Sequence, residues 1–442
     1  MYQKNKKVLS LFSGCGGMDL GFEGGFEIPK ININQKVYPE WALEEHRKNW
    51  LKLPSTTFNT IFANDIRPGA KAVWENYFSK RGSPKGTFHL ASIVELVKRS
   101  RKGLFCFPKN IDVVTGGFPC QDFSVAGKRM GFNSHKSHYG NVLSHLDNPS
   151  LENRGMLYTW MREVIDIVRP KMFVAENVKG LISLSEAKTI IENDFKSIGD
   201  NGYLVVGARV LHAAEYGVPQ GRERVIFFGF RKDLLNEEAM SALSNDFVPE
   251  EYDPYPIATH TLGNNADRMS MVTVREALSG LLEPEETDDL SQKSYSKAKW
   301  YGKHCQGQTE VNLDDIGPTI RSEHHGNIEY RRLNPEHGGK YLNELQKGLQ
   351  ERRLTVRECA RIQTFPDDYD FIIPRECENQ PVSTSEAYKL IGNAVPPLLA
   401  FHIAKRLEAI WSKIFNLQEE NNFENVYFNN LVKRQPSLFE VS

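Results

Sequence analysis

Short apolar runs that end in glycine or in polar residues recur along the first 230 residues of the chain. Residues 111–115 (IDVVT) are β-branched and carry Asp112 as their only charge, which is typical of a strand covered on both faces of a parallel sheet. Residues 157–168 (LYTWMREVIDIV) instead repeat apolar side chains at helical spacing, which predicts a helix with one face in the core. Strands that alternate with helices in this way predict a doubly wound α/β domain. The other predicted strands are 8–12, 60–65, 172–178 and the apolar run that follows Arg224 within residues 218–230.

Two of these strands end beside residues that can carry chemistry. After 111–115 the chain continues GGFPC, and we expect Gly116 and Gly117 to end the strand before Cys120. Ligands bind outside the carboxyl ends of strands in open α/β sheets, so Cys120 is a candidate nucleophile. A small buried hydrophobic side chain is the alternative for a lone cysteine. Glu176 ends the strand 172–178, where partial burial would raise its proton affinity and let it act as an acid.

Three further features lie at predicted strand ends. The first strand runs into a glycine-rich turn at 13–17, which suits close approach of a ligand but equally suits a plain tight turn. Asp65 ends the second strand, where an acidic residue can hold ribose hydroxyls or simply cap a turn. Arg222 and Arg224 precede the last strand, and alternation places both guanidinium groups on one face. A solvated basic rim is the alternative for the two arginines.

Composition narrows the class of protein. The 442 residues have a formal net charge of −1, so any contact with nucleic acid must come from local patches rather than from a basic coat. The six cysteines form no C-x-x-C pair, which supports neither a structural zinc site nor a disulfide framework. No stretch of 18 apolar residues occurs. These features predict a cytoplasmic protein without membrane contact.

Six stretches together resemble the DNA cytosine-5 methyltransferases of bacterial restriction–modification systems. They are LFSGCGGMDLGF, FPCQDFS, AENV, QGRER, RRLTVRECARIQTFPDDY and KLIGNAVPP, and they occur in that family's order. The resemblance implies a Rossmann-like S-adenosylmethionine-dependent methyltransferase sheet with a smaller, mixed target-recognition domain. It places the catalytic domain at 1–232, the recognition domain at 233–351, a C-terminal return to the catalytic domain at 352–415 and a polar tail at 416–442.

The resemblance also assigns roles to individual residues. Cys120 would add to carbon 6 of a flipped cytosine, Glu176 would protonate ring nitrogen 3, and Arg224 would hold O2. Arg222 would support the site or contact a phosphate. S-adenosylmethionine would be converted to S-adenosylhomocysteine without a metal. The implied cofactor contacts are Phe12, Gly14, Cys15, Gly17, Asp65, Ile66, Ser92, Pro119, Leu157, Asn393 and Val395, and the implied DNA contacts are Gln121, Ser124, Arg321, Arg331 and Arg332.

Some positions depart from the family pattern. Ser92 stands where the family often has an acidic residue beside the adenine, so a hydroxyl would replace a charge-assisted acceptor. Residues 124–154 form a longer loop than the family's usual lid. Its histidines lack a fourth metal ligand, which favours solvated side chains over a metal site. Residues 30–60 are an insertion between the first two strands. The loop histidines are His135, His138 and His145.

The charge distribution predicts where double-stranded DNA lies. Residues 71–110 hold nine Lys/Arg against two Glu, whereas residues 233–289 hold fourteen Asp/Glu against two Arg and should face away from the duplex. We expect a nucleoid-associated monomer, with a restriction endonuclease acting on the same site without direct contact. A tRNA methyltransferase, a non-catalytic DNA-binding homologue and a thiol hydrolase are the rival functions. The sequence does not identify the DNA site.

Overall fold

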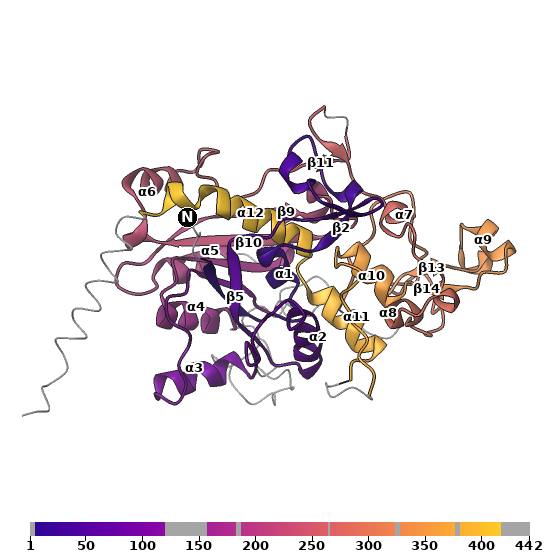
Figure 1. The fold of residues 1–442 in the computed structure, drawn as a ribbon, viewed down its shortest axis with the longest axis horizontal. Helices are drawn as coiled ribbons and strands as arrows, with labels where there is room; N and C mark the ends of the chain where they lie inside the picture. The colour runs from indigo at the N-terminus through magenta and orange to yellow at the C-terminus, as the bar shows by residue number, and fades with distance from the viewer. Residues whose placement is uncertain are drawn as a thin grey trace, which may run out of the picture.

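A seven-stranded mixed sheet organises the larger lobe of the molecule (Figure 1). The computed structural model describes residues 5–119, 157–182, 187–263, 266–322, 328–375 and 381–416. Only β10 runs antiparallel to its neighbours, and all other pairings in the sheet are parallel. In spatial order the strands are β6 (Phe88–Leu90), β5 (Phe58–Asp65), β1 (Lys6–Leu11), β7 (Val113–Gly117), β8 (Met172–Val178), β10 (Glu223–Arg231) and β9 (Tyr203–His212). The predicted Rossmann-like class is confirmed.

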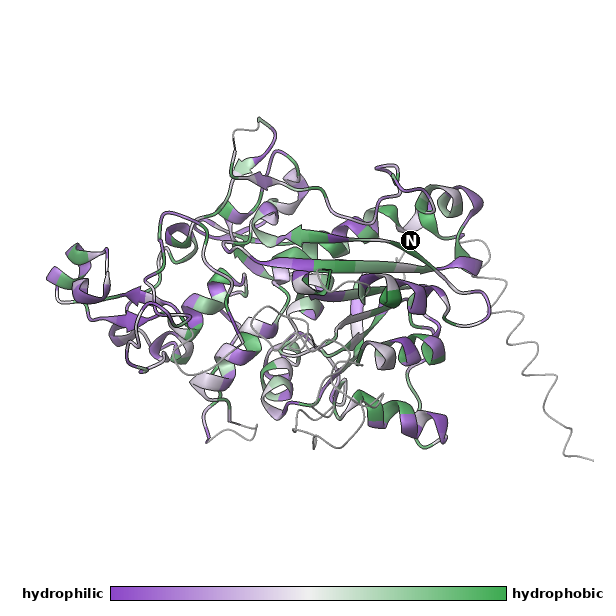
Figure 2. Cartoon of the chain, turned by 180° about the vertical axis from the view of Figure 1, so that it is seen from behind, coloured by the Kyte–Doolittle hydropathy of each residue, from purple (hydrophilic) through white to green (hydrophobic). Residues whose placement is uncertain are grey.

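Alternating strand residues feed two separate hydrophobic clusters, one on each face of the sheet. Val8 belongs to the cluster that contains α1 (Gly17–Glu23) and α12 (Pro397–Ile414). Leu9 belongs to the other cluster, which contains α3 (Ile93–Arg101), α4 (Leu157–Val168) and α5 (Ala187–Lys196). Figure 2 shows the hydrophobic residues concentrated along the central strands. Helices therefore cover both faces, as the continuous apolar strands predict.

The smaller lobe lies beside one end of the sheet (Figure 1). The first hydrophobic cluster continues into it through apolar residues between Val311 and Ile373, so the two lobes share a core. Its elements are α7 (Val274–Ala277), α8 (Leu290–Lys293), β13 (Tyr330–Arg332), α9 (Leu342–Gln346), β14 (Arg352–Arg353) and α10 (Val356–Ile362), with α11 (Thr384–Asn393) and α2 (Pro68–Phe78) between the lobes.

The insertion at residues 30–60 contributes to a small antiparallel sheet that braces the two lobes. Asn32 donates its amide to the carbonyl oxygen of Gly217, and Asn34 donates to that of Thr259. Arg47 pairs with Asp367, whose oxygens lie 2.7 Å from the guanidinium. The strands are β2 (Glu27–Pro29), β3 (Glu45–Arg47) and β4 (Trp50–Lys52), and β11 (His260–Thr261) pairs with β12 (Met269–Ser270) nearby.

The segment that follows β10 packs on the sheet lobe rather than on the smaller lobe. Leu235 forms a bridge with Phe415 after α12, and α6 (Glu237–Leu243) contacts α12 and β9. The hydroxyl of Tyr255 donates to the carbonyl oxygen of Ile226 in β10 at 2.8 Å. The apolar side chains of this segment, which follows the predicted boundary at residue 233, complete the core of the catalytic sheet.

As predicted, β7 ends at Gly117, before Cys120. The two glycines are the last residues of the strand rather than a break ahead of its end, and they pair with Ala175 and Glu176 of β8. Gly117 lies close to the side chain of Glu176. Among the described residues, no helix is both long and apolar enough to span a membrane.

Candidate active site

Glu176 lies at the carboxyl end of β8, directly beside the backbone of Gly117 in β7. A Cβ atom added to Gly117 would lie 2.7 Å from Oε2 of Glu176, so a larger residue there would force this carboxyl group to shift. Glu176 is 7% exposed, and parallel register between β7 and β8 fixes its position. Gly117, three residues before the predicted nucleophile Cys120, is thus a neighbour of the predicted acid Glu176.

Arg224, at the start of β10, forms an ion pair with Glu176. Nε of Arg224 lies 2.7 Å from Oε1 of Glu176, and both side chains are nearly buried. Antiparallel pairing of β10 with β8 brings them together, because Arg224 pairs with Val178 and Ile226 pairs with Glu176. Arg224 also donates to the carbonyl oxygen of Glu223.

Arg222 is fully buried and holds the C-terminal segment against the site. Its guanidinium donates to the carbonyl oxygens of Gly392 at 2.9 Å, Ala394 at 2.8 Å and Ile320 at 3.3 Å. Of the two roles expected for Arg222, support of the site fits this position. A phosphate contact does not, because the guanidinium is enclosed by the protein.

Burial controls the protonation of Glu176. Loss of solvent raises the pKa of Glu176 above its usual value, while the positive charges of Arg224 and Arg222 oppose the rise. A carboxyl group with a raised pKa is protonated in a larger fraction of molecules near neutral pH, so a proton is available for transfer. It is therefore suited to donate that proton to a base nitrogen.

Asn177 anchors the segment that leads to the predicted nucleophile. Its amide nitrogen donates to the carbonyl oxygen of Phe118 at 3.1 Å, and its amide oxygen accepts from the backbone of Val178. The path from β7 toward Pro119 is thereby tied to the end of β8. Cys120 itself lies outside the described residues, as do Gln121, Ser124 and the histidines of the 124–154 loop.

The glycine-rich turn after β1 provides an open cradle. Phe12, Gly14 and Gly16 have φ values of 54°, 54° and 82°, so the backbone turns through the left-handed region. A Cβ added to Gly14 would meet nothing within 4 Å, which leaves room for a ligand above the turn. Cys15 is fully buried and its thiol donates to the carbonyl oxygen of Leu390. Burial raises the pKa of the Cys15 thiol, so this residue offers a ligand only its backbone.

The ends of β5 and β6 form the next side of this cradle. A carboxylate oxygen of Asp65 accepts from the backbone of Gly14 at 3.1 Å, and the apolar side chain of Ile66 is 40% exposed. Asn64 donates from its amide to the carbonyl oxygens of His89 and Ala91, which precede the buried Ser92. These contacts draw three strand ends together. An acceptor beside an exposed apolar side chain fits a ribose and an adenine ring.

The remaining predicted cofactor residues are positioned by packing. Gly17 begins α1, and a Cβ there would overlap the carbonyl oxygen of Val395. Asn393 is exposed at the end of α11, Leu157 is buried at the start of α4, and Pro119 is half-buried after β7. The structure thus explains Gly17 as a site of close packing between the two ends of the chain.

Residues 6–409 match the family of C-5 cytosine-specific DNA methylases. The chain belongs to this family. It is 32% identical to the type II methyltransferase M.BspRI of Lysinibacillus sphaericus, over 92% of this chain and 82% of the relative. It is 30% identical to M.BsuRI of Bacillus subtilis, over 94% and 82% of the two chains.

Solved structures share the fold of this methylase. A putative DNA modification methyltransferase encoded within an Escherichia coli prophage covers 92% of this chain and 99% of its own, with a TM-score of 0.51 and 19% identity. The methyltransferase EhMeth of Entamoeba histolytica covers 93% and 99%, with a TM-score of 0.52 and 16% identity. The family confirms the predicted activity on carbon 5 of cytosine in DNA and implies S-adenosylmethionine as methyl donor.

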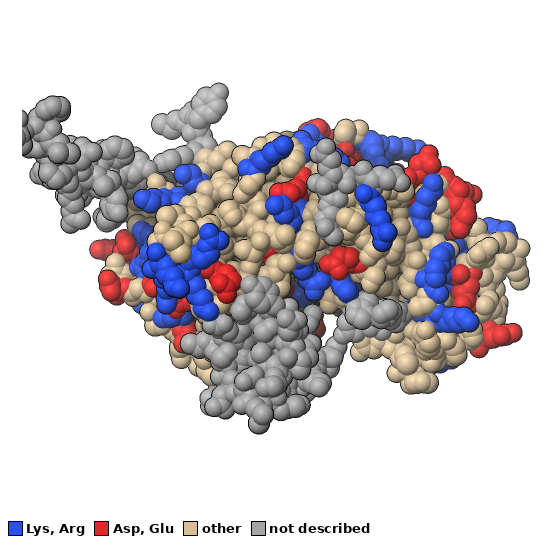
Figure 3. All heavy atoms as spheres, turned by 90° about the horizontal axis from the view of Figure 1, so that it is seen from below, with Lys and Arg blue, Asp and Glu red and all other residues tan. Residues whose placement is uncertain are grey.

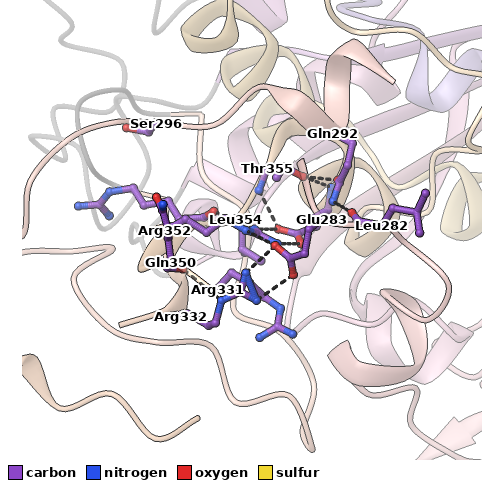
Figure 4. A network of polar contacts seen from close by, with 12 residues as sticks. Leu282, Glu283, Gln292, Ser296, Arg331, Arg332, Gln350, Arg352, Leu354 and Thr355 are labelled. Atoms are coloured by element: carbon purple, nitrogen blue, oxygen red, sulfur yellow. Dashed lines mark hydrogen bonds and ion pairs between the residues drawn. The ribbon is translucent and has the colours of Figure 1, made fainter. Parts of the chain in front are cut away.

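The three arginines expected to read DNA are all paired with glutamates of the methylase. Arg332 is 1% exposed and its guanidinium binds Glu283 at 2.5 Å (Figure 4). The same guanidinium binds Glu344 at 2.9 Å. The prediction for Arg332 needs correction, because a buried side chain held on both sides does not reach a duplex. Arg331 pairs with Glu344 as well, and Arg321 pairs with the buried Glu329 at 3.0 Å.

Three residues outside the predicted site also shape it. Gly117 leaves space for the carboxyl group of Glu176, Asn177 anchors Phe118, and Asn64 joins three strand ends. Asn64 and Asn177 are next to the predicted site residues Asp65 and Glu176 in the sequence, which was their only local signal. Among the described residues, no group of three or more His, Cys, Asp or Glu side chains could hold a metal ion.

Proposed function

We propose that this methylase modifies cytosines in a specific duplex sequence through a covalent bond to Cys120. The observation that carries the proposal is the buried Glu176–Arg224 pair, which lies beside Gly117, three residues before Cys120. A proton donor and a fixed positive charge at this place match what addition to the cytosine ring requires.

Three side chains, those of Cys120, Glu176 and Arg224, share the steps of the proposed reaction. The thiolate of Cys120 adds to carbon 6 of the ring while Glu176 donates its proton to nitrogen 3, so the ring becomes an enamine with electron density at carbon 5. Arg224 stabilises the charge that develops on O2. After methylation a base such as water takes the carbon 5 proton, the bond between carbon 6 and the sulfur of Cys120 breaks, and the proton on nitrogen 3 returns to the carboxylate of Glu176, so the aromatic ring is restored. The target base must leave the duplex to reach these groups.

S-adenosylmethionine supplies an electrophilic methyl group when bound. We assign its ribose to Asp65 and its adenine to the exposed face of Ile66, with the methionine portion over the open turn at Gly14. Ser92 is the candidate partner for the adenine amino group. Phe12, Pro119, Leu157 and Asn393 complete the proposed pocket, while Cys15, Gly17 and Val395 support its walls.

The covalent step is tested with duplex DNA that carries 5-fluorocytosine at every cytosine. The parent should form a denaturation-resistant adduct in the presence of S-adenosylmethionine, because fluorine does not leave as a proton does. Cys120→Ala should form no adduct and transfer no methyl group, while it still binds S-adenosylhomocysteine. Cys106→Ala is the matched control, since Cys106 is an exposed cysteine in another loop. Methyl transfer by Cys120→Ala would refute the covalent mechanism.

We also propose that the enzyme acts as a monomer and protects DNA from a restriction endonuclease without contacting it. The names of the relatives, which are type II methyltransferases, support this role. Figure 3 shows Lys and Arg gathered at the end of the molecule where α3 lies. That helix ends in Lys98, Arg99 and Arg101, which fits a duplex on this side. Light scattering should give a mass close to 50.4 kDa for the free protein.

A further inference from the structure

The smaller lobe carries a short segment whose outer face is basic and whose inner face is fixed to the core. Along residues 297–303 (KAKWYGK) exposure alternates strictly. Ala298, Trp300 and Gly302 are partly or fully buried between the exposed positions. This period of two presents one row of side chains to solvent. The exposed row is Lys297, Lys299, Tyr301 and Lys303.

The buried side chain of Arg353 holds this segment from beneath. Its guanidinium donates to the carbonyl oxygens of Ala298 and Lys299, both at 3.2 Å, and to that of Gly307 at 2.7 Å. It also stacks over the ring of Tyr330 at 4.1 Å. A buried cation is stabilised here by several carbonyl dipoles, so it fixes the backbone that supplies them.

Gln308 and His337 fix the middle of the segment. The backbone of Tyr301 donates to the side-chain oxygen of Gln308 at 2.8 Å, and the indole of Trp300 donates to its backbone oxygen at 3.0 Å. The Trp300 ring stacks on His337 with 4.2 Å between centroids. The segment is therefore anchored on its inner side by contacts at four successive residues, 298 to 301.

The lysines of the exposed row differ from Arg321, Arg331 and Arg332 in whether a carboxylate neutralises their charge. Within the described parts of the chain, no ion pair joins Lys297, Lys299 or Lys303 to a carboxylate, whereas Arg321 and Arg331 are neutralised by glutamates. Lys297 lies 3.4 Å from the ring centroid of Tyr295, and Tyr301 is 60% exposed. Unpaired cations with an exposed aromatic ring on a fixed backbone are suited to a polyanion.

We propose that residues 297–303 form the edge of the smaller lobe that grips duplex DNA, with Lys297, Lys299 and Lys303 on phosphates and Tyr301 against a base or sugar. This assignment rests on the proposed function and moves the DNA contact away from Arg331 and Arg332. Arg353 is a positioning residue that shapes the edge from below. The proposed edge sets the register of the duplex against the catalytic pocket.

The test compares three single alanine variants at these lysines and Tyr301→Ala with the parent. Binding of a duplex oligonucleotide of fixed sequence is measured at several salt concentrations, and methyl transfer is measured on a pool of randomised duplexes. Each lysine variant should bind all sequences more weakly and lower the salt slope by about 1. Tyr301→Ala should change the site preference or raise KM for DNA, with S-adenosylhomocysteine binding unchanged. Lys196→Ala is the matched control, because Lys196 is an exposed lysine at the end of α5.

The outcomes separate this inference from the proposed function. Unchanged affinity and salt slope in all three lysine variants, together with full methyl transfer by the parent, would overturn the proposed edge alone. A loss of binding confined to Arg321→Ala would also overturn it and return the contact to residues 320–331. A parent that transfers no methyl group to any duplex would instead refute the function on which the inference rests.

Discussion

Gly117→Ala is the substitution whose effect follows most directly from the geometry of the active site. The added Cβ would lie 2.7 Å from Oε2 of Glu176, whereas carbon and oxygen in contact need more than 3 Å. The backbone of β7 is fixed between β1 and β8, so the carboxyl group must move instead. That movement breaks or lengthens the 2.7 Å contact between Glu176 and Arg224.

The expected magnitude follows from the contact that is lost. A hydrogen bond to a charged group contributes about 1.5–3 kcal/mol. If the bond is made in full only when Glu176 is correctly placed, kcat falls by about tenfold to about a hundredfold, since 1.4 kcal/mol corresponds to tenfold. KM for S-adenosylmethionine should change little, because Gly14 and Asp65 are untouched.

Gly116→Ala is the matched control for this prediction. Its Cβ would lie 3.0 Å from Sδ of Met161, and a flexible thioether can move aside at small cost. The assay is transfer of tritiated methyl groups to duplex DNA at saturating cofactor, with circular dichroism to confirm folding. A folded Gly117→Ala variant whose kcat stays within twofold of the parent would show that Glu176 is not positioned by this glycine.

Two further predictions concern stability. Gly21→Ala should destabilise the protein by about 1–3 kcal/mol in urea unfolding, because the added Cβ would overlap Ala400 and the Pro397 carbonyl where α1 meets α12. Gly207→Ala is the control and should be near neutral, because a Cβ there meets nothing within 4 Å. Equal losses of stability in the two variants would exclude this packing argument. Burial lowers the pKa of His402 to about 3, so the unfolded chain binds a proton that the folded protein does not, and stability should fall by up to about 1.4 kcal/mol for each pH unit below about 6.5. His402→Phe should lose part of this acid sensitivity, and identical pH dependence in parent and variant would contradict the assignment.

Local residue patterns were enough to predict the main strands and helices and the family. The strand 172–178 and the helix 157–168 are observed with the predicted bounds, because their apolar spacing is a local property of the chain. The turn after β1 and the acid at the end of β5 were also found from residue type and position alone. The order of the six motifs along the chain was then enough to predict methyl transfer to carbon 5 of cytosine.

Strand register decided how the active site is assembled. Nothing local to Gly117 shows that it faces Glu176, because that contact depends on the pairing of β7 with β8 across some 59 residues of chain. The same holds for Arg224, which reaches Glu176 only through antiparallel pairing of β10. The sequence therefore predicted that the strand ends at these glycines, but not that Gly117 leaves space for Glu176.

Tertiary structure also decided what each charge does. Arg332 and Arg352 share Glu283, which the sequence counts within an acidic segment, and the three meet in the interior of the smaller lobe (Figure 4). A charge count along the chain does not separate buried pairs from solvated side chains, because pairing depends on residues far apart in sequence. The basic surface of residues 297–303 can therefore be recognised only in the folded structure, which shows which cations the glutamates neutralise.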